Sequence, residues 1–144
     1  MKSICRWEQK LNHMMSYLLN PSLLITRLII GNMFFWAGLG KLKNLERTIS
    51  FFTSLNIPFP QAQAPFVATI ELLGGALIIL GLYTRISAIL LSGVMVVATL
   101  TTQLDKIESF KSLASVKEIL YLLILLLIAA IGAGKISIDS KRKC

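Results

Sequence analysis

Apolar residues in this chain of 144 residues gather in four long stretches that are separated by polar segments. A transmembrane helix needs about 20 mostly apolar residues to cross the hydrocarbon layer. The third stretch has 19 residues without a charge, and the other three each contain one or two charges, as occurs when helices face a polar interior. The pattern predicts an all-α integral membrane four-helix bundle, with spans near residues 23–40, 64–83, 86–104 and 115–134.

Residues 1–20 have a different pattern, because their apolar positions recur every three or four residues. Such spacing gives a helix one apolar face and one basic polar face, which is typical of a helix lying in the lipid headgroup region. A surface helix packed on protein fits the same pattern. Charges interrupt the segment too often for the apolar core of a secretory signal. The apolar positions are Ile4, Trp7, Leu11, Met14 and Leu18.

The connection between the first two spans, residues 41–63, contains a second amphipathic segment. Its apolar residues recur at helical spacing and predict a short surface helix around residues 44–55. Prolines follow this segment, and we expect them to end any helix because proline lacks the backbone N–H group. These prolines are Pro58, Pro60 and Pro65.

Composition agrees with a membrane location and a single domain. Hydrophobic residues make up 55% of the chain and charged residues 15%, whereas soluble domains carry about 25% charge. The mean hydropathy is +0.72. We divide the chain into an amphipathic segment 1–20, a four-span domain 21–139 and a basic tail 140–144.

The net charge of +8 does not indicate nucleic acid as a partner, because the basic residues flank the apolar stretches. That placement sets the orientation of a membrane protein and attracts anionic lipid. With four spans, nine Lys and Arg residues fall on the side of both termini and six on the other side. The positive-inside rule then predicts both termini in the cytoplasm of a bacterial-type inner membrane.

Six charged residues in or next to the spans are the candidate site residues. A charge within a span costs a few kcal/mol on insertion scales, so it usually faces protein and a partner. The depth of each charge along the membrane normal, counted at 1.5 Å per helical residue, predicts two clusters. The outer cluster is Lys41, Glu71 and Glu118, and the inner cluster is Arg27, Arg85 and Asp139.

Glu71 is the deepest of these charges, and Gly74 and Gly75 follow it, so another helix or a ligand can approach closely there. Both clusters have a second interpretation, in which they only fasten helices together. We expect no metal site, because His13 is the single histidine and the cysteines Cys5 and Cys144 lie at opposite ends of the chain.

With these residues in view, the chain resembles the DoxX family of small bacterial membrane proteins. Four stretches carry the resemblance in order: RLIIGNMFFWAGLGKL from Arg27, NIPFP from Asn56, IELLGGALIILGLYTR from Ile70, and GAGKISID from Gly132. The resemblance implies four membrane helices. It also implies, for some members, a link to respiratory electron transfer, as in the thiosulfate–quinone oxidoreductase subunits, or to quinone and oxidant stress.

The residues leave three hypotheses for function. We find no haem ligand pair, flavin motif or cysteine cluster, so we expect no intrinsic cofactor. The first hypothesis is a redox-associated membrane subunit that works with a partner subunit and binds a quinone-like or other lipophilic ring compound. The second is a non-catalytic scaffold or small-molecule permeation module. The third is an enzyme using Glu71 and Lys41 as an acid–base pair on an apolar substrate. The oligomeric state stays open.

Overall fold

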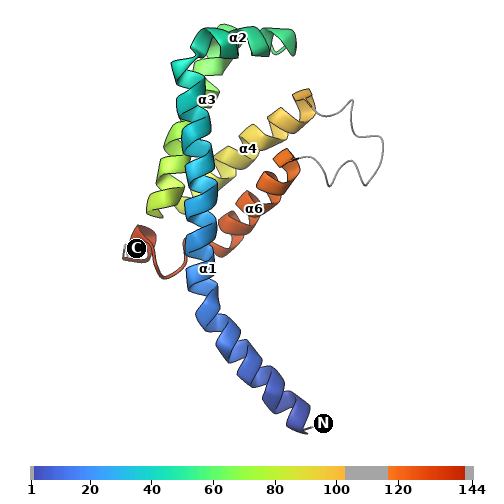
Figure 1. Cartoon of the computed structure of the whole chain (residues 1–144), viewed down its shortest axis with the longest axis vertical. Helices are drawn as coiled ribbons and strands as arrows, with labels where there is room; N and C mark the ends of the chain where they lie inside the picture. Colours follow the sequence, from blue (N-terminus) through green and yellow to red (C-terminus); the bar gives the residue numbers. More distant parts are fainter. Residues whose placement is uncertain (1, 103–116, 142–144) are drawn as a thin grey trace.

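The computed structural model describes residues 2–102 and 117–141, with side chains from residue 17 onward. Every regular element in these ranges is a helix (Figure 1). The predicted all-α class is confirmed. In chain order the helices are α1 (Lys2–Lys43), α2 (Leu45–Ser54), α3 (Pro60–Leu80), α4 (Thr84–Thr102), α6 (Lys117–Ile131) and α7 (Ile138–Lys141).

Three helices are long and apolar enough to cross a membrane, within α1, α3 and α4. Their candidate spans are Tyr17–Lys43, Pro60–Leu80 and Thr84–Thr101. The fourth predicted span corresponds to α6, of which 15 residues are described, while its predicted start at residue 115 lies outside the described residues. Exposed Leu and Ile side chains on all four helices give them an apolar outer surface, as contact with lipid requires.

The first helix is longer than predicted. We expected a boundary near residue 20, but α1 continues for 42 residues with Pro21 inside it. At 1.5 Å per residue it is about 63 Å long, roughly twice the hydrocarbon thickness. In Figure 1 its N-terminal part extends beyond the other helices and bends away from the axis of the rest of α1. A proline within a helix is a common cause of such a bend.

The connection between α2 and the second span is shorter than predicted, because two of the three prolines expected to stop any helix belong to α3. The short helix itself is confirmed as α2, with Thr48 and Phe52 buried. Pro60, however, is the first residue of α3, and Pro65 lies inside that helix. Proline is favoured at the first helical position, because the N–H group there has no helical acceptor. The residue before it, Phe59, has a positive φ of 51° and turns the chain into α3.

The helices form two pairs. The C-terminal half of α1 packs along α3, α4 packs along α6, and contacts of α3 with α4 connect the pairs. Figure 1 shows α4 and α6 running away from the upper part of α1 and α3. The core lies where the pairs meet and consists of Ile30, Phe34, Ile78, Ala88, Leu91, Met95, Leu125 and Ile128.

Glycines allow α1 and α3 to pack backbone against backbone. A Cβ atom added at Gly31 would lie 2.8 Å from the carbonyl oxygen of Gly75, and one added at Gly75 would lie 2.5 Å from the amide nitrogen of Phe35. At Gly38 the added atom would collide with the backbone of Leu72. Small residues serve this purpose in membrane helices, where close packing replaces the hydrophobic drive for association.

Candidate functional site

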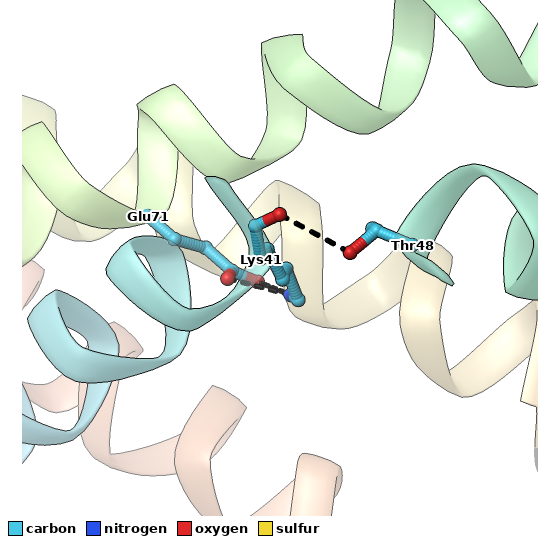
Figure 2. Close-up of polar contacts among 3 residues, drawn as sticks. All are labelled: Lys41, Thr48 and Glu71. Atoms are coloured by element: carbon cyan, nitrogen blue, oxygen red, sulfur yellow. Dashed lines mark hydrogen bonds and ion pairs between the residues drawn. The ribbon is translucent and has the colours of Figure 1, made fainter. Parts of the chain in front are cut away.

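An ion pair joins the end of α1 to the middle of α3. The Nζ atom of Lys41 lies 2.5 Å from both carboxylate oxygens of Glu71 and donates hydrogen bonds to them (Figure 2). This confirms the prediction that Glu71 is buried and that Lys41 is its partner. Two residues separated by 30 positions in the chain are thus held in direct contact between two spans.

The glycine contact at Gly38 sets the register that brings these residues together. Gly38 lies one turn before Lys41 on α1, and it packs against Leu72 and Ala68 of α3. Glu71 is next to Leu72 in the chain. Because α1 and α3 run antiparallel at this contact, Lys41 comes level with Glu71. A larger residue at position 38 would push the helices apart and lengthen the ion pair.

The two partners differ in burial. The side chain of Glu71 is 2% exposed, whereas that of Lys41 is 33% exposed. A carboxylate buried among spans is retained only when it is paired, because moving an unpaired charge out of water costs several kcal/mol. The pair therefore consists of a buried carboxylate and a partly exposed ammonium group that a ligand can contact. A pair of this kind can donate a hydrogen bond or move a proton when a ligand replaces part of the contact.

Thr48 of α2 lies on the other side of Lys41. Its hydroxyl donates to the carbonyl oxygen of Asn44 at 3.0 Å and to that of Lys41 at 3.3 Å (Figure 2). The bond to Lys41 joins α2 to the end of α1. The surface helix is thus fixed directly to the backbone of the residue that pairs with Glu71. Sequence analysis did not single out Thr48, because an isolated threonine in an amphipathic segment carries no distinctive signal.

Glu118 does not join this ion pair. We expected it in the outer cluster, but within the described residues the ion pair of Lys41 is with Glu71. Glu118 lies in the first turn of α6. That helix packs mainly on α4 and only slightly on α1, and its start lies far from the upper end of α1 in Figure 1. Depth alone predicted a contact that the divergence of the helix pairs prevents.

Arg27 is the second buried charge of the spans, with 1% of the residue exposed. Its guanidinium donates to four backbone carbonyl oxygens, and within the described residues none of its hydrogen bonds goes to Glu71. Two of these carbonyl groups belong to the last turn of α3, and the other two belong to the segment that follows α6. The acceptors are Ile78 at 3.1 Å, Ile79 at 3.2 Å, Ala133 at 2.5 Å and Ile136 at 3.0 Å.

Asp139 lies near Arg27, as predicted for the inner cluster, but the hydrogen bonds of Arg27 go to the backbone carbonyls. It contributes electrostatic attraction to Arg27, while its carboxylate oxygens accept hydrogen bonds from the amides of Tyr83 and Thr84, both at 2.9 Å. Its own amide donates to the carbonyl oxygen of Gly81 at 2.9 Å. Asp139 therefore caps the N-terminus of α4, where a negative charge is favourable.

Arg85, the third residue of the predicted inner cluster, is exposed. Its guanidinium lies against Gly132, where an added Cβ atom would be 3.2 Å from Nε. The inner cluster therefore contains one buried arginine and one exposed arginine near Asp139. Sequence reasoning identified all three side chains and missed the backbone carbonyls, since a carbonyl group exists at every position and has no sequence signal.

Comparisons with known proteins agree with the resemblance seen in the sequence. The family model described as DoxX matches residues 22–104. A relative from Bacillus subtilis (strain 168), described as "Putative oxidoreductase CatD", is 41% identical over 81 residues, which cover 56% of this chain and 59% of the relative. The match thus spans less than two thirds of that protein. No solved structure matches significantly.

Proposed function

The chain belongs to the DoxX family of membrane proteins, and on this premise we propose that it is a redox-associated membrane subunit. In this proposal it binds a quinone-like or other lipophilic ring compound beside the Lys41–Glu71 ion pair. The word oxidoreductase in the name of the Bacillus subtilis relative supports the redox part of the proposal. We place the protein in a bacterial-type inner membrane with both termini in the cytoplasm, as the distribution of basic residues favours.

The observation that carries the proposal is the Lys41–Glu71 pair itself. A quinone carbonyl needs a hydrogen-bond donor, and its reduction takes up two electrons and two protons. Lys41 supplies a donor that is one third exposed, and Glu71 supplies a buried acid–base group in contact with it. The chain offers no electron carrier that sequence analysis recognises, so a partner subunit would supply the electrons. The role of this chain would be to bind the ring and deliver protons.

The surroundings of the pair suit an apolar molecule. The spans on which the two residues lie have apolar side chains on their outer faces, and a lipophilic ring reaches such a site through the bilayer. Trp36 lies five residues before Lys41 and is 59% exposed. At helical rise this is about 7.5 Å along the axis, so Trp36 is well placed to report a nearby ring by fluorescence quenching.

The test is a titration of the purified full-length protein in detergent with a short-chain ubiquinone and a short-chain menaquinone, followed by tryptophan fluorescence. We expect saturable quenching. Glu71→Gln should weaken binding about tenfold, because a hydrogen bond to a charged group contributes about 1.5–3 kcal/mol. Glu46→Gln is the matched control, since it removes the same charge from an exposed position on α2, and it should leave binding unchanged.

Two results would contradict the proposal. One is the absence of saturable quenching in a wild-type protein whose circular dichroism shows intact helices. The other is equal binding by the wild type and Glu71→Gln. A Trp36→Phe variant identifies which tryptophan reports the ligand, because Trp7 also lies in the chain.

A non-catalytic scaffold or permeation module is the second candidate, and the close packing of α1 on α3 favours it. Lys41 and Glu71 neutralise one another, and the glycine contacts join the same two helices. Holding α1 against α3 is therefore a sufficient role for the ion pair. Recovery of a stable protein partner from native membranes, together with no quinone binding, would favour this function over the first.

A further inference from the structure

A groove opens at the opposite end of the spans from the Lys41–Glu71 pair. It has a volume of about 820 Å³ and lies between the α3–α4 turn and the segment that follows α6. Figure 1 shows this C-terminal segment, ending in α7, beside the end of α3. The lining includes Thr84, Arg85, Gly132 and Ser137.

Positive charge is concentrated at this groove. Arg85 is exposed in its lining and, within the described part of the chain, makes no hydrogen bond or ion pair. Lys135 and Lys141, which lie in the adjoining segment, are also exposed. Asp139 also lines the groove, and its carboxylate accepts hydrogen bonds from the amides of Tyr83 and Thr84 at the start of α4. The groove thus offers an arginine fork, which suits the planar recognition of a phosphate or carboxylate.

One buried polar atom in the wall of the groove also lacks a partner. Thr84 is fully buried, and its hydroxyl is without a hydrogen bond among the residues that the structure describes. Buried hydroxyls are usually bonded, so an unbonded one needs an explanation. A polar ligand seated in the groove, or a water held by that ligand, would provide the missing partner.

The rim of the groove is apolar where it meets the membrane. Ile86 of α4 and Ile131 of α6 line it and are 58% and 40% exposed. These residues lie at the ends of helices that run into the bilayer, so the polar part of the groove is level with lipid headgroups. A ligand that fits both parts has an anionic head and an apolar tail.

We propose that this groove binds an anionic phospholipid, with its phosphate against Arg85 and its acyl chains along Ile86 and Ile131. The proposal does not depend on quinone binding, because neither Lys41 nor Glu71 lines the groove. Bound lipid would connect the α3–α4 turn to the segment after α6, two parts of the chain that Arg27 also joins.

The test measures lipid binding by native mass spectrometry of the full-length protein released from detergent, titrated with phosphatidylglycerol or phosphatidylcholine. We expect a clear preference for phosphatidylglycerol. Arg85→Gln should weaken phosphatidylglycerol binding about fivefold, the usual effect of one basic residue at an anionic lipid surface. Arg47→Gln is the matched control, because it removes the same charge from an exposed site on α2 at the other end of the molecule.

The remaining arms distinguish the lipid from a free phosphate and from general surface charge. Glycerol 3-phosphate should bind far more weakly than phosphatidylglycerol, since it lacks the tail that Ile86 and Ile131 would hold. Equal binding of the two would overturn the proposal in favour of a soluble anion. Equal losses in Arg85→Gln and Arg47→Gln would overturn it in favour of general charge attraction. Arg85→Lys, which keeps the charge without the fork, should retain part of the preference.

Discussion

Arg27 in the first membrane helix donates a hydrogen bond of 2.5 Å to the carbonyl oxygen of Ala133, 106 positions later in the chain. The same guanidinium reaches the end of α3, so one side chain joins three parts of the protein. A buried arginine usually pairs with an acid, but here its main acceptors are backbone carbonyls, two in the last turn of α3 and two in the segment that follows α6. Arg27 thereby closes one end of the bundle.

Replacing Arg27 should destabilise the protein more than removing any exposed arginine. Arg27→Leu removes the guanidinium donor from four carbonyl oxygens that are buried or partly buried, and we expect it to lower the free energy of unfolding by about 2–4 kcal/mol. The measurement is unfolding of the detergent-solubilised protein, followed by circular dichroism. Arg47→Leu, at an exposed site on α2, should change stability by less than about 0.5 kcal/mol. Equal stability of the two variants would show that the carbonyl contacts contribute little.

The Lys41–Glu71 pair should behave as a coupled unit. Lys41→Met leaves a carboxylate that is almost fully buried without its cation, and we expect a loss of about 3–5 kcal/mol. Lys41→Met combined with Glu71→Leu removes both charges and should recover much of that loss. A double-mutant cycle measured by unfolding in detergent gives the coupling energy. A coupling near zero would mean that the two charges do not interact in the folded protein.

The glycines of α1 and α4 should respond to alanine in opposite ways. Gly38→Ala places a methyl group against the backbone of α3, so we expect a loss of about 1–3 kcal/mol from overpacking. Gly93 of α4 has no atom within 4 Å of an added Cβ, and Gly93→Ala should therefore be neutral or stabilise its helix by up to about 1 kcal/mol. Similar effects at both positions would contradict the close packing of α1 on α3.

The orientation of the spans can be tested with reporter fusions. The distribution of basic residues predicts that the α3–α4 turn and both ends of the chain face the cytoplasm, with the Asn56–Pro60 loop on the other side. A fluorescent-protein reporter joined after residue 144 should be active, and an alkaline phosphatase reporter inserted after Asn56 should also be active. An inactive phosphatase after Asn56, or a fluorescent reporter after residue 144 that stays dark, would contradict the proposed topology.

The sequence by itself determined the class of fold and most of the membrane helices. Apolar length, spacing and turn residues are local properties, and the bilayer requires each span to satisfy its own backbone hydrogen bonds. The position of α2 and the pairing of Lys41 with Glu71 followed from the same local rules with helical depth added. Local rules were less reliable at prolines, because proline is unfavourable in the interior of a helix but favoured at its first position, where Pro60 lies.

Only the tertiary structure decided which charges meet across the bundle. Depth along the membrane placed Glu118 near Lys41, but the lateral separation of the helix pairs keeps it out of that ion pair. Arg27 found carbonyl groups instead of a carboxylate because two helix ends converge on it. Depth follows from counting residues in one helix, whereas lateral position follows from how several helices pack. The glycine contacts that fix this packing act between residues far apart in the chain.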